Sequence, residues 1–261
     1  MTIPIYQIDA FASTLFEGNP AAVCPLPRWL PDDLLQAIAA ENNLSETAFF
    51  VQESQGYRIR WFTPTSEVDL CGHATLATAF VIFHILQTQR DHVEFASRSG
   101  KLTVEQEGDW LVMNFPAQPP VPCEPPEMLI RAFGKSPAEC LKAEDYLAVF
   151  EDETDIKALQ PDLSMLKQLD LRGVIITAPS QTHDFVARFF APKLGVPEDP
   201  VTGSAYTQLA PYWSHRLGAR RFHARQVSAR GGELLCELRG DRVFIFGKAV
   251  PYLQGTITVP G

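Results

Sequence analysis

Short runs in both halves of the chain are rich in apolar residues and have the length and composition of β-strands. In the first half the predicted strands cover residues 4–11, 21–25, 47–51, 57–62, 92–96, 101–106 and 110–115. In the second half they cover residues 146–150, 173–178, 184–190, 222–227, 233–238 and 242–247. Residues 32–41 are predicted to form a helix.

Two further segments, 73–87 and 204–217, have the length of helices and few charged residues on any side. A helix without a polar face is buried all round. Because strands precede and follow each segment, the sequence predicts a strongly curved β-sheet, or barrel, wrapped around a central apolar helix in each half. The predicted fold class is α+β.

A weak internal repeat relates the two halves. The sequence RWFTP at 60–64 recurs as RFFAP at 188–192, an offset of 128 residues (188 − 60). Glu67 and Gly72 recur as Glu198 and Gly203, an offset of 131 residues (198 − 67). Matches in the same order, with small drifts in offset, indicate two similar domains related by a pseudo-twofold axis.

Six prolines between residues 116 and 126 separate the halves. Proline lacks an amide donor and has a fixed φ, so this segment is disfavoured within a sheet or a helix. The predicted organisation is an N-terminal half at 1–115, a proline-rich crossover at 116–126 and a C-terminal half at 127–249, with 250–261 completing the first half. A surface loop within one domain is the alternative for the proline-rich segment.

Composition and charge restrict the partners of the protein. The 261 residues include 46% hydrophobic side chains, enough for sizeable cores, and the formal net charge is -9. An acidic protein repels phosphate backbones and anionic lipid, so we expect no nucleic-acid or membrane partner. The five cysteines form no CxxC pair, so neither disulfides nor a metal site is expected. The N-terminal residues do not resemble a signal peptide, and a cytoplasmic location is expected.

Each apolar helix is predicted to begin at a glycine beside small polar or imidazole side chains. The two segments are Cys71-Gly72-His73 and Thr202-Gly203-Ser204. Unpaired N–H groups and the positive end of the dipole favour an anion at a helix start, so a carboxylate ligand is expected. The alternative is that both glycines merely form tight turns and that Ser204 is an N-cap.

Several motifs, taken together and in order, resemble the PhzF-like isomerase family of phenazine biosynthesis. They are Asp9-Ala10-Phe11, GNPAAV at 18–23, NLSETAF at 43–49, LCGHAT at 70–75 and EDPVTGSA at 198–205. The resemblance covers nearly the whole chain and implies the diaminopimelate epimerase-like fold. It also implies a cofactor-independent isomerase or epimerase that uses acid/base catalysis on a small carboxylate-bearing substrate and forms a homodimer.

Residue roles follow from the same resemblance. It implies catalytic roles for Glu46, His73 and Asp199. It implies substrate binding by residues at the two helix starts and in the first of the family's motifs: Asn19, Cys71, Gly72, Thr202, Gly203 and Ser204. Taken singly, each charged residue has a plainer interpretation: an exposed glutamate at a strand start, a core histidine and a loop aspartate.

The distribution of titratable residues between the halves favours a single base. A two-thiol epimerase needs a thiolate on each face of the substrate carbon, whereas Cys71 has Thr202 as its repeat mate. Glu46 has no carboxylate counterpart, because Gly173 and Val174 occupy the equivalent stretch. This asymmetry is typical of a one-base shuttle by Glu46. The alternatives are a hydrolase that uses Ser204, and a catalytically idle member of the fold that binds a small ligand or a protein.

Overall fold

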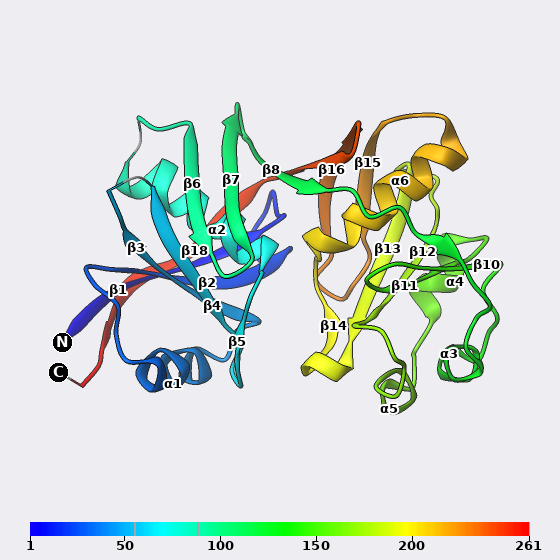
Figure 1. Cartoon of the computed structure of the whole chain (residues 1–261), viewed down its shortest axis with the longest axis horizontal. Coiled ribbons are helices and arrows are strands. Elements are labelled where there is room, and N and C mark those ends of the chain that lie inside the picture. The colour runs from blue at the N-terminus through cyan, green and yellow to red at the C-terminus, as the bar shows by residue number, and fades with distance from the viewer. Residues whose placement is uncertain (55, 88, 261) are drawn as a thin grey trace. The chain divides into compact units, whose positions relative to one another are not determined.

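The computed structural model describes residues 1–54, 56–87 and 89–260, and the chain divides into two compact units. Unit 1 consists of Met1–Asn114 together with Phe246–Gly261, and unit 2 consists of Phe115–Ile245. The C-terminal segment therefore returns to the unit in which the chain begins. Each unit is an α+β domain in which a curved sheet is packed around a helix (Figure 1).

Unit 1 contains most of the elements of the first half and the last strand of the chain. In chain order they are β1 (Thr2–Ala10), β2 (Asn19–Leu26), α1 (Asp32–Asn42), β3 (Glu46–Gln52), β4 (Tyr57–Phe62), β5 (Glu67–Val68), α2 (Gly72–Val81), the π-helix η1 (Ile82–Leu86), β6 (His92–Ser97), β7 (Gly100–Glu107), β8 (Trp110–Pro116) and β18 (Ala249–Thr258). The last two residues of β8 lie in unit 2.

The sheet of unit 1 mixes parallel and antiparallel pairs. β1 is antiparallel to both β18 and β2, and β2 is parallel to β3. β4 is antiparallel to β3 and parallel to β6, and hairpins join β6, β7 and β8. The parallel pairs require crossovers, which α1 and the α2–η1 helix supply. Both termini lie together, because the Met1 amino group donates to the Val259 carbonyl oxygen at 2.6 Å.

The central helix of unit 1 is as apolar as the sequence indicates. α2 packs against β1, β2, β3 and β18, and all of its residues except Gly72 and Phe80 are buried. Buried Thr75 and Thr78 donate their hydroxyl groups to backbone carbonyl oxygens one turn earlier, so their burial leaves no hydroxyl unsatisfied. The helix beyond Val81 is a π-helix with a bond from the Gln87 N–H to the Ile82 oxygen, where the sequence predicts one continuous helix.

Unit 2 contains a second set of strands and several short helices. In chain order they are β9 (Val121–Pro122), α3 (Glu127–Phe133), β10 (Glu139–Lys142), β11 (Tyr146–Val149), α4 (Glu153–Ala158), α5 (Leu163–Leu166), β12 (Val174–Pro179), β13 (Phe185–Ala191), the 3-10 turn η2 (Pro192–Leu194), β14 (Val196–Asp199), the 3-10 turn η3 (Gly203–Ala205), α6 (Tyr206–Leu217), β15 (Arg221–Gln226), β16 (Gly232–Arg239) and β17 (Arg242–Gly247). The end of β17 belongs to unit 1.

The pairing in unit 2 repeats that of unit 1. β11 is parallel to β12, β12 is antiparallel to β13, and β13 is parallel to β15, just as β2, β3, β4 and β6 follow one another in unit 1. Every residue of β13 is buried. α6 packs against β15 and β16 and buries its first five residues together with Tyr212 and Trp213.

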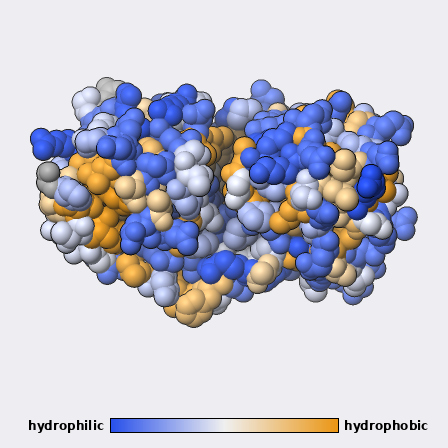
Figure 2. Space-filling view, turned by 90° about the horizontal axis from the view of Figure 1, so that it is seen from below, coloured by the Kyte–Doolittle hydropathy of each residue, from blue (hydrophilic) through white to orange (hydrophobic). Residues whose placement is uncertain are grey.

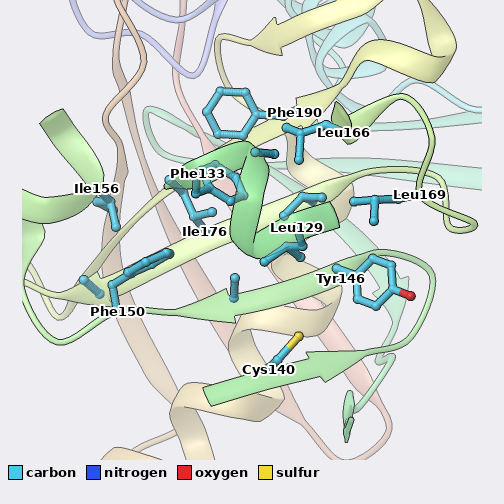
Figure 3. Packing of buried hydrophobic residues seen from close by; sticks show 14 of the residues in the cluster. Leu129, Phe133, Cys140, Tyr146, Phe150, Ile156, Leu166, Leu169, Ile176 and Phe190 are labelled. Carbon is cyan, nitrogen blue, oxygen red and sulfur yellow. The ribbon is translucent and has the colours of Figure 1, made fainter. Parts of the chain in front are cut away.

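A hydrophobic cluster in unit 2 lies between its sheet and the helix α3. Figure 3 shows Leu129 and Phe133 of this helix pointing toward Phe190 and Ile176 of the sheet. The Phe133 ring meets the Phe190 ring edge to face, with 5.9 Å between centroids. The helices α3, α4 and α5 are not predicted from the sequence, because helices this short have too few turns for a recognisable hydrophobic period.

The proline-rich segment is attached to unit 2. The Ala117 and Gln118 N–H groups donate to the Asp241 and Thr207 carbonyl oxygens, and β9 pairs with β10. The segment thus contains one short strand, which the proline content tolerates because β9 is only two residues long. Among the described residues, no helix is long and apolar enough to cross a membrane.

Candidate functional site

Four of the residues singled out in the sequence meet in unit 1. Asn19 and Glu46 are the first residues of β2 and β3, which run parallel with Ala21 opposite Glu46. Cys71 is the N-cap residue of α2, and His73 lies in its first turn. Two strand starts and one helix start therefore bring an amide, a carboxyl, a thiol and an imidazole together.

The imidazole of His73 is the centre of this cluster. Its Nε2 lies 3.1 Å from Oε2 of Glu46. Its Nδ1 lies 3.2 Å from Nδ2 of Asn19 and 3.5 Å from Sγ of Cys71. In the neutral ring, the Asn19 amide donates to Nδ1 and the proton on Nε2 faces Glu46. In the protonated ring, the proton on Nδ1 has the Cys71 sulfur as its acceptor.

The Glu46–His73 pair is nearly removed from solvent. The side chains are 13% and 6% exposed. Within the described part of the chain, neither Glu46 Oε2 nor His73 Nε2 has a hydrogen bond of good geometry, although only 3.1 Å separates them. Buried polar atoms are normally satisfied, so these two atoms retain capacity for a ligand or for proton transfer. The exposed-glutamate interpretation of Glu46 is wrong for this structure.

The charge state of His73 depends on its neighbours. Burial alone would lower the pKa of His73, but its interactions with Cys71 and Glu46 outweigh burial and raise that pKa well above 6.5. Burial also raises the pKa of the Cys71 thiol to about 11. The thiol is therefore protonated at neutral pH, and Glu46 is the group that stabilises the imidazolium.

The same cluster offers donors for a metal ion. One ligand atom each of Glu46, Cys71 and His73 lies within 4.8 Å of the others. Thiolate, imidazole and carboxylate are zinc ligands, but binding here would have to remove a proton from a thiol whose pKa is about 11. The expectation that the protein uses neither metal nor cofactor in catalysis stays a prediction.

Asp199 and Thr202 meet in unit 2. The Thr202 hydroxyl donates to Asp199 Oδ2 at 2.5 Å. The fully buried Gln226 holds the same loop, because its Nε2 donates to the Asp199 carbonyl oxygen at 2.6 Å and its Oε1 accepts from the Thr202 N–H at 2.9 Å. Thr202 thus fixes a carboxylate, whereas its repeat mate Cys71 lies beside an imidazole.

Ser204 belongs to a second network in unit 2. Arg172 Nη2 donates to Ser204 Oγ at 3.1 Å, and the same guanidinium binds both oxygens of buried Asp145 at 3.0 and 2.6 Å. Gln208 Nε2 donates to Asp145 as well, at 3.2 Å. Burial opposes the charge on Arg172, but Asp145, Glu144 and Asp199 raise its pKa. Arg172 is thus a permanent cation beside Ser204.

This network corrects two interpretations of Ser204. Its side chain accepts a hydrogen bond from Arg172 and makes no capping bond, and α6 begins only at Tyr206 after the turn η3. A guanidinium is not a general base, so Arg172 does not activate Ser204 as a hydrolase nucleophile. Gly72 is the first residue of α2 and Gly203 is the first residue of η3, so each glycine begins a helical turn.

Sequence reasoning missed Gln226, Arg172, Asp145 and Gln208. Arg172 directly precedes Gly173, but no local motif marks it. The sequence did offer one chemical signal, an aspartate that follows another acidic residue in an apolar strand region. If such an aspartate is buried, it needs a cation beside it. Asp145 is such a residue: it precedes the fully buried strand β11, and its side chain has no exposed surface.

Comparison with known proteins finds a family model and relatives that match nearly the whole chain. The model of the family described as "Phenazine biosynthesis-like protein" matches residues 8–255. A curated relative, an uncharacterised isomerase of Pseudomonas aeruginosa, is 58% identical over 257 residues, which are 98% of this chain and 99% of that protein.

Solved structures agree with this match. A crystal structure of a PhzF-family phenazine biosynthesis protein from Enterococcus faecalis has a TM-score of 0.96 and 46% identity, and the alignment covers 99% of this chain and 100% of that one. A structure described as a predicted epimerase from Pseudomonas aeruginosa has a TM-score of 0.79 at 19% identity, covering 99% and 100% of the two chains, and shows the shared fold alone.

Proposed function

The chain belongs to the phenazine biosynthesis-like family and is an isomerase; we propose that it moves a proton within a small carboxylate-bearing substrate, with Glu46 as the single base. The observation that carries this proposal is the buried Glu46–His73 pair, whose facing atoms are 3.1 Å apart and retain unused hydrogen-bonding capacity among the described residues. General acid–base catalysis needs such a group within reach of the substrate and away from bulk water.

The chemical step is a proton shuttle. The Glu46 carboxylate removes a proton from a carbon next to a carbonyl or a conjugated double bond, and the electron pair of the broken C–H bond delocalises into that system. The same carboxyl returns the proton to a second carbon, so the product is an isomer and no oxidant or reductant is needed. The His73 ring faces the Glu46 carboxyl at 3.1 Å, and Asn19 and Cys71 orient that ring.

The remaining predicted residues are assigned to substrate binding. The polar groups of Asp199, Thr202 and Ser204 are proposed to contact the substrate, while Glu46 alone moves the proton. The backbone N–H groups of the turns that begin at Gly72 and Gly203 are proposed to bind its carboxylate. Support comes from the hydrogen bonds that fix the Asp199–Thr202 loop and the Ser204 hydroxyl.

Isotope exchange tests the role of Glu46. Wild-type protein incubated in D2O with candidate carboxylic acids is expected to incorporate deuterium at a carbon-bound position, followed by NMR. Glu46→Gln keeps the shape of the side chain and removes the base, so the exchange rate is expected to fall about 10²- to 10⁴-fold. Glu53→Gln is the matched control, since Glu53 is an exposed glutamate just after the same strand.

Two outcomes would count against the proposal. Undiminished exchange in Glu46→Gln would remove Glu46 as the base. Ligands that stabilise the protein against heat but show no exchange would support a catalytically idle small-ligand-binding member of the fold. Thermal unfolding of each variant separates a loss of chemistry from a loss of structure.

We also infer a homodimer from exposed apolar groups of unit 1. Leu15, Phe16, Tyr252 and Leu253 are exposed, and Phe16 and Tyr252 contact each other edge to face with 5.9 Å between ring centroids. Figure 2 shows hydrophobic patches of this kind on an otherwise mainly hydrophilic face. Contiguous apolar surface that is exposed in a single chain is typical of protein interfaces. Phe16→Asp is expected to convert the dimer to monomer in sedimentation analysis. A cytoplasmic location stays a prediction.

A further inference from the structure

A second cluster of imidazole and carboxylate groups lies in unit 2, apart from Asp199 and Ser204 in the sequence. His183 Nε2 lies 3.3 Å from Glu233 Oε1, and His223 Nε2 lies 3.2 Å from Glu233 Oε2. The two imidazole rings are 4.7 Å apart between centroids. One ligand atom from each of the three residues lies within 4.8 Å of the others.

The backbone fixes the positions of these side chains. His223 and Glu233 lie on paired strands, β15 and β16, in which His223 is opposite Leu235 and Arg225 is opposite Glu233. The two side chains are therefore diagonal neighbours on one face of the sheet.

His183 is tied to the same place through its neighbour. Asp184 N–H donates to the His223 carbonyl oxygen at 2.9 Å, and the His223 N–H donates to Asp184 Oδ2 at 2.6 Å. Three separate chain segments thus hold the three donors before any ligand binds.

From this geometry we propose that His183, His223 and Glu233 form a binding site for a divalent late first-row transition-metal ion, Zn²⁺ being the expected occupant. Bonds of roughly 2.0–2.1 Å to a tetrahedral Zn²⁺ place ligand atoms roughly 3.3–3.4 Å apart, which is close to the distance from each histidine Nε2 to its facing oxygen of Glu233. Two imidazoles and one carboxylate leave the fourth position for water, as in zinc sites that remain open.

The surroundings support ligation at Nε2 of His183. Thr182 Oγ1 lies 2.9 Å from His183 Nδ1, so the hydroxyl can accept the Nδ1 proton and leave the Nε2 lone pair for the metal. The His183 side chain is 11% exposed, while His223 and Glu233 are 45% and 41% exposed. The site is therefore open to an ion on one side and supported by protein on the other.

Arg225 is the competitor for the carboxylate. Its Nη1 donates to Glu233 Oε1 at 2.6 Å, the oxygen that also faces His183. A metal ion on Glu233 must share that carboxylate with the guanidinium or displace it. Removal of the Arg225 charge should therefore tighten metal binding, an effect that a damaged fold does not produce.

The sequence carries no local signal for this site. Zinc sites recognised from sequence have closely spaced ligands, whereas these three residues are spread over positions 183, 223 and 233 with no CxxC or HxxxH spacing. The expectation of no metal site rests on that absence of spacing. The cluster arises only when β15 pairs with β16 and the loop before β13 binds β15.

Zinc titration of the full-length, chelator-treated Cys71→Ser protein tests the proposal by calorimetry. The substitution removes the thiol of the other donor cluster, Glu46–Cys71–His73. We expect one equivalent of Zn²⁺ to bind, and His183→Asn or His223→Asn on the same background to weaken binding about tenfold or more. Arg225→Gln is expected to tighten it. Mg²⁺ is expected not to bind, because it prefers all-oxygen sites.

His92→Asn is the matched control. His92 is an exposed histidine between two glutamates, Glu94 and Glu105, at 3.5 and 3.8 Å, and has no second imidazole. Its loss should leave the Zn²⁺ affinity unchanged. The proposal is overturned if the Cys71→Ser protein binds no Zn²⁺, or if it binds Zn²⁺ equally well with and without the two histidines of unit 2. Circular dichroism checks that each variant is folded.

Discussion

The junction that leads into α2 in unit 1 and the junction that leads into η3 and α6 in unit 2 share one scaffold. Arg60 on β4 binds both carboxylate oxygens of Glu67 at 2.7 and 2.8 Å, and Arg188 on β13 binds both oxygens of Glu198 at 2.7 and 2.9 Å. Each bidentate pair ties a long strand to the short strand before the helical turn.

The two junctions differ in the side chains that they bring together. Unit 1 places a titratable thiol, imidazole and carboxyl in contact through Cys71, His73 and Glu46. In unit 2 the strand that corresponds to β3 begins at buried Val174, and a Cβ on Gly173 would lie 2.7 Å from the Phe190 carbonyl oxygen. Packing therefore leaves no room there for a side chain in place of glycine.

This difference separates proton transfer from positioning. In unit 1 the polar atoms of Glu46 and His73 keep unused capacity within the described residues, whereas Asp199, Thr202 and Gln226 in unit 2 are joined by short hydrogen bonds. A shared scaffold with unlike side chains agrees with the proposal of a single base, because the carboxyl of Glu46 in unit 1 has Gly173 at the equivalent place in unit 2.

The largest effect is expected from the loss of Arg172 in unit 2. Arg172→Met leaves the fully buried Asp145 carboxylate without its cation, and breaking such a pair costs about 3–5 kcal/mol. Urea unfolding measures the change. In Arg172→Met/Asp145→Asn the buried charge is gone as well, so most of the loss should be recovered. A double variant as unstable as the single one would show that Arg172 acts mainly by packing.

The two bidentate pairs are expected to contribute unequally to the free energy of unfolding. Arg188 also donates to the Ile156 and Leu159 carbonyl oxygens and is 7% exposed, whereas Arg60 makes its third contact with exposed Asp32. Since buried hydrogen bonds to charged groups contribute about 1.5–3 kcal/mol each, Arg188→Met should cost about 3 kcal/mol or more and Arg60→Met about 1–2 kcal/mol. Equal losses in urea unfolding would contradict the ranking.

Sequence patterns predicted the parts of the fold that repeat. Strands β3, β4, β6 and β7 and their counterparts in unit 2 are runs rich in apolar residues and long enough to be recognised, and α2 is apolar enough to be placed. The short helices α4 and α5 have six and four residues, and their position depends on packing against the sheet. Propensity alone does not locate such elements.

The candidate site was predictable only in part, for a physical reason. Motifs placed Glu46, Cys71 and His73, but nothing local indicates that Asn19 and Cys71 both lie beside Nδ1 of His73. Contacts of this kind depend on strand register. The Arg172–Asp145 pair is similar, since its members are 27 residues apart and meet only after β11 and β12 have paired.

A smaller effect is expected when Cys71 is replaced by serine. Burial raises the pKa of this thiol to about 11, so it is protonated at neutral pH and does not serve as a base. The exchange rate of Cys71→Ser should therefore fall by less than about tenfold, far less than that of Glu46→Gln. Thr202→Ser, which keeps the hydroxyl donor to Asp199, is the control at the repeat mate. A thousandfold lower exchange rate in Cys71→Ser would instead support a mechanism in which the Cys71 thiol takes part.

The charge of His73 is expected to make the unfolding free energy depend on pH. The pKa of His73 is raised in the folded protein, because Cys71 and Glu46 outweigh its burial. Protonation of His73 therefore stabilises the fold, fully below about pH 6.5 and progressively less as the pH rises through the folded pKa. The difference in unfolding free energy between wild type and His73→Gln should shrink as the pH is raised from about 6 to 9.

His84, in the same helical run, gives the opposite sign. Burial lowers the pKa of His84, so its neutral form is favoured in the folded protein. The His84→Gln variant should therefore gain stability relative to wild type as the pH falls through 6.5. Because His84 is largely exposed, its slope should be the weaker of the two. Parallel pH profiles for the two variants would show that the Glu46 charge does not act on His73, and would remove the electrostatic basis for a carboxylate at position 46.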